Sequence, residues 1–502
     1  MIADFSPLLV YNTGVPNLKT HEKGEKVMRK SSSQISMFDT YDAVLTSMEE
    51  SKPELIKLLE AHIDLESLIP EGFYRAFYKS TGREHSYHLV SFLWFFILKK
   101  LFSIGLVSQM ILILNCSKEL RDLCGFDKVP GQSKFSEFCK NYCAWIEKFF
   151  EHLVEVTEPI CREIDKKKAD YLIYDTTGIE PPVAENNPKF FNSKLKQAKQ
   201  SAKVNPELNP YKLVYGLLPD QSETNPDARQ QYINGHYAYA MKAGIVTNGL
   251  GVVRAISFFD NDFRAKHPEV VTPKSDDPDK DKEIGDSVSL KPVVNDFFDA
   301  HPGFHYSTFI GDSAFDSYDN YSLLRKMEFH RVCVPLNPRN SGSSNETANG
   351  VPCCPADGTP FIRLGRSGGR NRSERIKWVC PKSERIPGTA QRVCTCDHPC
   401  TSAKTGKYAY TYPDDARDFR ACPGIQRNTE HWDNLYRHRV MIERTIFLLK
   451  DSFALDETKS FRTVTLKADL FFAGIAQLLG VILAEKLHKR KLFKSVKKLL
   501  AA

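Results

Sequence analysis

The sequence predicts an α/β protein, a mixed β-sheet flanked by helices, with a helical domain ahead of the sheet and a Cys/Arg-rich insertion within it. Three observations support this fold class. Apolar residues recur at helical spacing from about 50 to 160, and short runs rich in β-formers follow between 171 and 336. Strong helical patterning returns from about 433, after a long stretch rich in Cys, Gly, Arg and Pro.

The domain organisation that we expect follows these changes of composition. A chain of 502 residues can bury a large core and form several domains. The predicted segments are a polar, loosely ordered N-terminus (1–45), a helical N-terminal domain (46–165), the first part of the α/β core (166–336), a Cys-rich basic insertion (337–422), the second part of the core (423–485) and a basic tail (486–502).

The charge balance is compatible with a polyanionic partner but does not require one, because 69 basic residues face 62 acidic ones. The distribution is more informative. The stretch 361–393 carries nine Lys or Arg against two Glu, and the stretch 486–498 carries seven Lys or Arg and no acid. For each stretch alone, a solvated surface and a nucleic-acid contact are equally good interpretations.

The thirteen cysteines and the apolar stretches favour a reduced, cytoplasmic setting. No basic region precedes the apolar residues of the segment 1–11, so a secretory signal is not expected. The apolar run 470–483 is shorter than the roughly 20 residues that a membrane span needs. We therefore expect a buried helix there and no membrane partner.

The core elements can be placed along the chain. A strand over 171–174 ends at Asp175, and a hairpin joins the runs 237–246 and 252–259 through Asn248-Gly249. A polar stretch between them, 186–234, is predicted as an inserted loop. The later elements are a helix over 293–299, a strand over 306–310 that runs into Asp312, a helix over 318–326 and a strand over 331–336.

Four polar residues share one face of the predicted helix after 433. Tyr436, Arg439, Glu443 and Lys450 are offset by three, seven and fourteen residues from the first, which places them within an arc of about 60°. The carboxylate can bind a hard cation, and the cationic groups and the phenol can hold phosphates or a base. Any one of them alone would be an incidental surface residue, but four on one ridge favour a site.

One carboxylate cannot hold a catalytic pair of metal ions, which needs several carboxylates that converge. Asp175 and Asp312 are the natural companions of Glu443, because each follows a predicted strand and projects from a sheet edge. Taken singly, each Asp is better explained by a turn or a helix cap.

These motifs resemble those of bacterial insertion-sequence DDE transposases of the YREK-motif group. The spacing of Tyr436, Arg439, Glu443 and Lys450 matches the signature of that group without a gap. The segment 174–178 (YDTTG) resembles its first-Asp motif, and the segment 310–316 (IGDSAFD) resembles its second-Asp motif. The resemblance covers about 170–483; more weakly, 82–138 resembles the helical region that binds the inverted repeats of these transposases.

The resemblance implies a ribonuclease H-like core in which Asp175, Asp312 and Glu443 hold Mg²⁺ or Mn²⁺. It implies that the enzyme binds the terminal inverted repeats of a mobile element, cuts the DNA and joins the 3′-OH to target DNA. Hairpin intermediates are typical of the group, and such enzymes generally act as dimers on double-stranded DNA near the bacterial nucleoid.

The resemblance also implies that Tyr436, Arg439 and Lys450 hold end phosphates and a displaced base. One departure is an interruption of about 130 residues between Asp312 and Glu443.

The interruption contains a cluster of candidate zinc ligands. Its Cys and His residues are Cys353, Cys354, Cys380, Cys394, Cys396, His398 and Cys400. Cys380, Cys394, Cys396 and Cys400 supply enough ligands for structural zinc, but two clean Cys-x-x-Cys pairs are missing. Ordinary thiols are slightly favoured over zinc.

Two further residues are weaker candidates. His236 begins a core strand and Glu180 follows Asp175, but a structural histidine and a solvated carboxylate are the better interpretations. Three other functions stay open: an inactive DNA-binding derivative of a transposase, a nuclease of the same core that does not join strands, and a zinc-stabilised binding module.

Overall fold

The computed structural model describes residues 52–79, 85–205, 207–233, 236–273, 283–337, 351–369, 372–411, 419–420, 423–494 and 498–499. The predicted N-terminal segment 1–45 lies outside these residues. The chain from Pro53 onwards forms one compact unit.

The expected helical region is confirmed. Its helices are α2 (Glu54–His62), α3 (Leu65–Leu68), α4 (Glu71–Phe77), α5 (Leu89–Leu101), α6 (Val107–Cys116), α7 (Lys118–Cys124), α8 (Gln132–Ile164) and α9 (Lys166–Ala169). Helix α5 is apolar around its whole circumference and is almost completely buried. Such a helix cannot face water on any side, so the neighbouring helices must enclose it.

A six-stranded mixed sheet follows. Its strands are β1 (Tyr171–Ile179), β2 (Arg229–Ile233), β3 (His236–Asn248), β4 (Val253–Phe258), β5 (Thr308–Ile310) and β6 (Arg331–Cys333). β1 pairs antiparallel with β3 and parallel with β5. β3 also pairs antiparallel with β2 and β4, and β5 pairs parallel with β6. The predicted hairpin, β3–β4, is confirmed.

The two faces of the sheet pack against different cores. Along β1, Tyr171 and Ile173 belong to the core shared with the helical region, whereas Leu172 and Tyr174 belong to a second core. The second core contains residues of α13 (Asp286–Ala300) and α14 (Tyr318–Lys326), and the short helix α12 (Asn261–Lys266) contributes Phe263. Side chains of a strand alternate between faces, so Asp175 shares the face of Tyr171 and Ile173.

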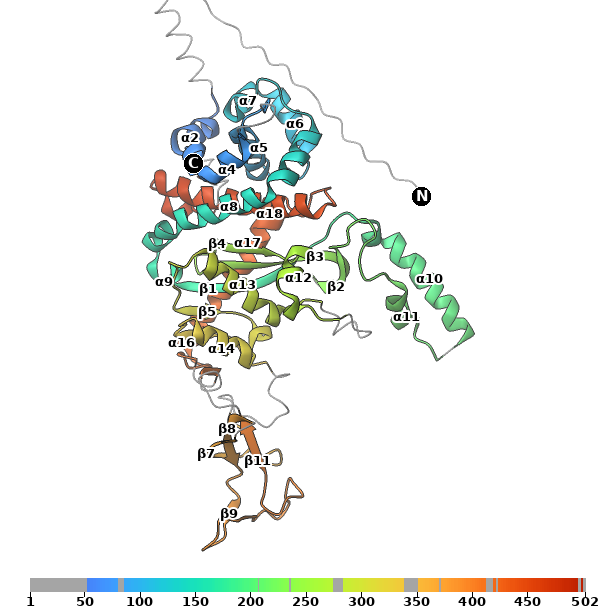
Figure 1. Ribbon diagram of the computed structural model, residues 1–502, viewed down its shortest axis with the longest axis vertical. Helices are drawn as coiled ribbons and strands as arrows, with labels where there is room; N and C mark the ends of the chain where they lie inside the picture. The colour runs from blue at the N-terminus through green and yellow to red at the C-terminus, as the bar shows by residue number, and fades with distance from the viewer. Residues whose placement is uncertain are drawn as a thin grey trace, which may run out of the picture. The chain divides into compact units, whose positions relative to one another are not determined.

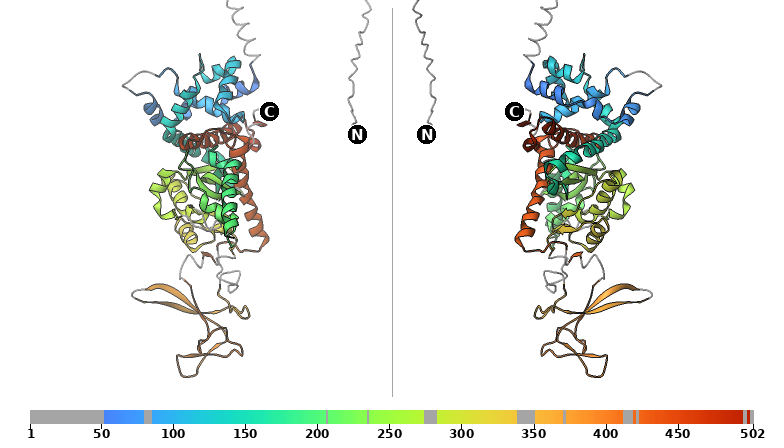
Figure 2. Two further views of the ribbon diagram at one scale, coloured as in Figure 1. Left: turned by 90° about the vertical axis from the view of Figure 1, so that its right-hand side faces the viewer. Right: turned by 90° about the vertical axis from the view of Figure 1, so that its left-hand side faces the viewer.

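The last long helix, α18 (Thr463–Lys486), lies alongside α8 between the helical region and the sheet, as both side views show (Figure 2). It is long and apolar enough to cross a membrane by length and composition, but almost all of its apolar window is buried inside the protein. It extends beyond the apolar run 470–483, and the expectation of a buried helix is confirmed.

The predicted loop over 186–234 is wrong. This segment contains α10 (Pro188–Val204), α11 (Pro210–Leu217) and β2, and the two helices pack on each other (Figure 1). The Asn187 side chain caps α10 by accepting from the Lys189 amide, and Pro188 occupies its first turn. These are strong helix-start signals, which the polar composition of the segment obscured.

The bounds of several core elements also differ from the prediction. β1 does not stop before Asp175 but continues to Ile179, because β3 pairs with it over its whole second half. β5 and β6 are shorter than expected and α13 is longer, whereas α14 has the predicted bounds.

The insertion, expected to be irregular, contains five short strands: β7 (Ile362–Gly369), β8 (Arg372–Val379), β9 (Ser383–Arg385), β10 (Arg392–Cys394) and β11 (Tyr408–Thr411). β7, β8 and β11 form one antiparallel sheet, and β9 and β10 form another.

The helical run that carries the predicted ridge changes its winding. It consists of α16 (Glu430–Tyr436), a 3₁₀ turn (Arg437–Arg439), α17 (Val440–Phe447) and a π-helical turn (Leu448–Ser452). A regular helix over the whole run is therefore wrong. A short 3₁₀ helix (Arg490–Leu492) lies in the basic tail.

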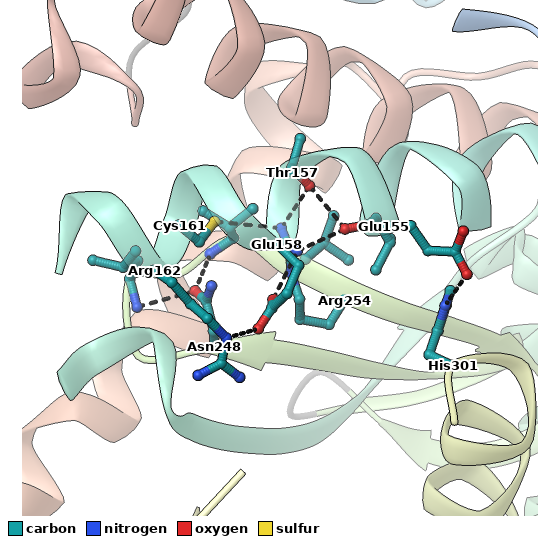
Figure 3. Close-up of polar contacts among 12 residues, drawn as sticks. Glu155, Thr157, Glu158, Cys161, Arg162, Asn248, Arg254 and His301 are labelled. Carbon is teal, nitrogen blue, oxygen red and sulfur yellow. Dashed lines mark hydrogen bonds and ion pairs between the residues drawn. The ribbon is translucent and has the colours of Figure 1, made fainter. Parts of the chain in front are cut away.

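A buried arginine ties the helical region to the sheet. Arg254 of β4 is fully buried and donates to the Val154 carbonyl and the Thr157 hydroxyl, each at 3.1 Å (Figure 3). Its charge faces Glu158 of α8 at 3.3 Å, and Arg162 holds the same carboxylate at 2.8 Å. Two cations thus share one buried carboxylate.

Because Glu158 has two cationic partners and Arg254 has one acidic partner, removing Glu158 should cost more stability than removing Arg254. We expect Glu158→Leu to destabilise the protein by about 3–5 kcal/mol, because it leaves the Arg254 charge buried without a counter-charge. Arg254→Met should cost less, since Glu158 keeps Arg162. Thermal unfolding of the two variants measures the difference. Equal losses, or a milder effect of Glu158→Leu, would contradict this account.

A second buried charge cluster joins α5 to α18. Lys99 and Lys100 contact the two carboxylate oxygens of Asp469 at 3.0 Å and 2.6 Å. Burial lowers the pKa of Lys100 to about 7, with the charge of Asp469 opposing that effect and the charge of Lys99 adding to it.

Asp469→Asn is expected to destabilise the protein by about 3–5 kcal/mol below pH 7, because two buried ammonium groups lose their shared carboxylate. The loss should shrink as the pH approaches about 9, where Lys100 is neutral in the folded state and needs no counter-charge. The pKa of Lys100 is lower in the folded protein than in the unfolded chain. Its contribution to the free energy of unfolding therefore rises with pH.

Thermal unfolding at about pH 6 and about pH 9 tests this expectation. Glu485→Gln, at an exposed pair with Arg490 near the end of the same helix, is the control and should cost below about 1 kcal/mol at either pH. A loss for Asp469→Asn that is independent of pH would contradict the role assigned to Lys100.

Candidate active site

Two aspartates come together through the register of β1 and β5. Ile173 pairs with Ile310, and each Asp lies two residues further along its strand direction, at Asp175 and Asp312. Gly311 lies between the end of β5 and Asp312. A Cβ at this position would lie only 2.9 Å from the Phe315 ring, so the close approach of the ring favours glycine. The sheet therefore delivers both carboxylates to one edge.

The third carboxylate comes from the helical run after the insertion. α17 packs against β1 and β3 and carries Glu443. It covers the face of β1 to which the alternation of side chains directs Asp175. The chain thus returns to the sheet after the insertion and places Glu443 opposite the two aspartates.

Arg439 is the point at which the three carboxylates meet. Its guanidinium nitrogens lie 2.6 Å from Glu443 Oε1, 3.4 Å from Asp175 Oδ2 and 3.9 Å from Asp312 Oδ2. The Arg439 side chain is 23% exposed, so water screens these contacts only in part. One cation therefore bridges carboxylates from three elements that lie far apart in the sequence.

The protonation of Asp175 reflects this environment. Burial raises its pKa to about 6, the Thr176 amide and Arg439 act in the opposite direction, and the neighbouring carboxylates of Asp312 and Asp286 raise it further. Asp312 instead accepts a hydrogen bond from the Ala314 amide at 2.8 Å and caps the short 3₁₀ helix Ser313–Phe315. The site is a crowded group of acids that a positive charge stabilises.

Carboxylate oxygens are the donors that Mg²⁺ and Mn²⁺ prefer. The donor set formed by Asp175, Asp312 and Glu443 fits such an ion, because the same oxygens already converge on the Arg439 guanidinium. Among the described residues, no three acidic, His or Cys side chains form a ready metal-binding group. Loading an ion here therefore requires the guanidinium to give way.

Of the other two ridge residues, Tyr436 lies close enough to Arg439 and Asp312 to interact with them electrostatically, whereas Lys450 contacts other elements. Tyr436 stacks on Trp432 with ring centroids 4.8 Å apart, and burial raises its pKa. Lys450 donates to the Gly178 carbonyl at 2.9 Å and pairs with Asp456 at 3.4 Å. The ridge therefore brings Arg439 and Glu443 to the aspartates, and its two ends contact neighbouring elements.

Sequence reasoning missed Asp286 near this site, and it quoted Asp316 in the second-Asp motif without giving it a role. Asp286, at the start of α13, accepts from the Thr176 hydroxyl at 2.6 Å and pairs with Lys242 at 2.5 Å. Asp316 forms a fully buried bidentate pair with Arg420, with two contacts of 2.8 Å. An acid in a first helical turn is too common a signal to have singled out Asp286.

The weaker candidates also have defined positions. His236 and Glu180 contact each other at 3.0 Å, with the histidine more than half exposed. Of the cysteines proposed for zinc, Cys380 is buried, and Cys394, Cys396 and Cys400 are partly buried. Cys400 lies 3.8 Å from Cys354, sulfur to sulfur.

The comparison with family models supports a transposase. The model described as "Transposase domain (DUF772)" matches residues 44–141, which include α2 to α7 and the start of α8. No curated protein matches the chain. The matched segment lies in the helical region rather than in the sheet that carries the three carboxylates. The match thus supports a transposase family from a part of the chain that is independent of the candidate active site.

Proposed function

We propose that this protein is a DDE transposase that cuts the ends of a mobile element and joins them to target DNA. The observation that carries this proposal is the convergence of Asp175, Asp312 and Glu443 on one cationic point. The transposase-domain match to the helical region supports the same class.

We further propose that the sheet is a ribonuclease H-like core. The order β4-β3-β1-β5-β6, with β1 antiparallel to β3 and parallel to β5 and with β6 parallel to β5, supports this assignment. Asp175 lies within β1 just past its pairing with β5, Asp312 follows the end of β5, and the glutamate lies on a helix over the same face of the sheet.

In this mechanism, Asp175, Asp312 and Glu443 would hold Mg²⁺ or Mn²⁺. Such ions supply an activated water and neutralise charge on the leaving oxygen. Asp175 must be ionised to take part, and burial raises its pKa to about 6. Arg439, released from the carboxylates, would hold a DNA phosphate in a bidentate contact. Tyr436 and Lys450 flank it and would position the DNA end.

The partners in this proposal are the inverted repeats and the target, both double-stranded DNA, with two copies of the chain acting together in the bacterial cytoplasm. The helical region and the basic insertion are the proposed DNA-binding parts. The excess of Lys and Arg over acidic residues in the insertion suits a phosphate backbone.

The cleavage assay uses a labelled duplex that carries the inverted repeats flanking the gene, with Mg²⁺, Mn²⁺ or EDTA. Wild-type protein should nick the repeat boundary only with metal. Glu443→Gln should lower cleavage about 10³-fold, an effect of ~4 kcal/mol, because a carboxylate ligand is lost. Glu443→Gln should still bind the duplex in a gel-shift assay.

Glu430→Gln, at an exposed residue of α16 in the same helical run, is the matched control and should cut normally. Binding without cleavage by the wild type under every metal would overturn the enzyme and leave an inactive DNA-binding protein. Cleavage without joining would point to a nuclease.

A second experiment tests the position of Arg439. Arg439→Gln should strengthen Mn²⁺ binding to the DNA-free protein about tenfold, or ~1.4 kcal/mol, because the guanidinium and the ion compete for the same oxygens. Isothermal titration calorimetry measures the affinity. Arg437→Gln, at an exposed neighbour that contacts Asn434, should not change it. Weaker binding by Arg439→Gln would contradict the competition.

A further inference from the structure

The insertion has a very small apolar core. Its cluster of buried residues consists of Cys354, Phe361 and Cys380, with Trp378 and Cys400 packed against it. Small β-structures with so little apolar burial generally need a disulfide or a metal to hold them together. Two of the three buried members are thiols, and so is one of the residues packed on them.

The distance between two of these thiols suits a metal site. The sulfurs of Cys354 and Cys400 lie 3.8 Å apart. Zn–S bonds of about 2.3 Å in a regular tetrahedron place neighbouring sulfurs about 3.8 Å apart. Cys354 and Cys400 are 46 residues apart in the chain, so the fold of the insertion, rather than local spacing, brings them together.

The β9–β10 ladder brings further thiols towards Cys380. Ser383 pairs with Cys394 in this ladder, and the Thr395 amide donates to the Lys382 carbonyl at 3.0 Å. Continuing this antiparallel register beyond Ser383 sets the segment Cys394–Cys396 beside Cys380. Cys394 and Cys396 are two residues apart, so both side chains lie on the same side of the extended chain.

The environment of Cys380 agrees with this placement. Cys354 and Cys394 are both among the groups that act electrostatically on its thiol, so both lie near it.

We propose that the insertion binds one Zn²⁺ through the thiolates of Cys354, Cys380 and Cys400 and one sulfur of the segment Cys394–Cys396. This ligand set differs from the one expected from sequence, because Cys354 enters it. Among the described residues, no three of these thiols already surround one point closely enough to hold a metal ion. Binding would therefore draw the segment Cys394–Cys396 towards the other three thiols.

Such a site would fix the two small sheets of the insertion to each other. Cys380 directly follows β8, Cys394 is the last residue of β10 with Cys396 just after it, and Cys354 and Cys400 lie outside the strands. β7 presents the exposed residues Arg363 and Arg366 at its outer surface. The ion would then hold a basic surface in one shape without taking part in DNA cleavage, so the inference does not depend on the proposed function.

The test is the metal content of the full-length chain, purified under reducing conditions and measured by plasma mass spectrometry. We expect about one zinc per chain. Cys354→Ser, Cys380→Ser, Cys400→Ser and the double variant Cys394→Ser/Cys396→Ser should each lose most of it. Cys353→Ser is the matched control and should keep it, since the Cys353 sulfur donates to the Val351 carbonyl.

Cobalt replacement is a second readout that needs no variant. The reduced wild-type chain should take up one Co²⁺ and show the absorption of a tetrahedral thiolate complex. A chain without zinc that also gives no such spectrum would overturn the proposal. So would equal zinc loss in Cys353→Ser and Cys354→Ser, or a native Cys354–Cys400 disulfide in a metal-free protein.

Discussion

Strand β1 is the element on which the rest of the structure depends. It pairs antiparallel with β3 over eight residues and parallel with β5 at its start, so it joins the two halves of the mixed sheet. Its alternating side chains reach two separate cores, one shared with the helical region and one formed with α13 and α14. Asp175 lies where the parallel pairing with β5 has ended and the pairing with β3 continues. At that position the pairing with β3 holds the backbone, while on the other side of β1 the pairing with β5 has ended.

Buried charges, rather than apolar packing alone, connect the distant parts of the chain. Arg254 joins β4 to α8, Asp469 joins α18 to α5, and Arg420 joins the end of the insertion to Asp316 near the second aspartate. Each of these pairs is costly if one partner is missing, so each specifies which elements meet. Arg439 does the same at the candidate active site, but its partners there remain partly exposed to water.

The transposase-domain match and the carboxylate site support the proposed transposase function independently of each other. The first rests on residues 44–141 and concerns a helical region without any of the three acids. The second rests on geometry in the sheet and α17. The insertion separates Asp312 from Glu443 in the chain, yet closing a loop costs free energy that grows only slowly with its length. A long insertion is therefore compatible with a tight site, provided that its two ends are anchored.

The sequence by itself determined the helical region, the β3–β4 hairpin and α14, because each leaves a local pattern of apolar spacing or turn residues. Motif spacing also singled out Asp175, Asp312 and Glu443 as candidate site residues. It also supplied Arg439 as a ridge residue, but not its contact with all three carboxylates. The α10–α11 pair was missed because polar composition outweighed a clear Asn-Pro helix start. Only the tertiary structure decided that β1 continues past Asp175, that Asp286 lies near it, and that Cys354 meets Cys400. These outcomes depend on pairing between segments far apart in the chain. Local residue patterns do not show which distant segments will pair.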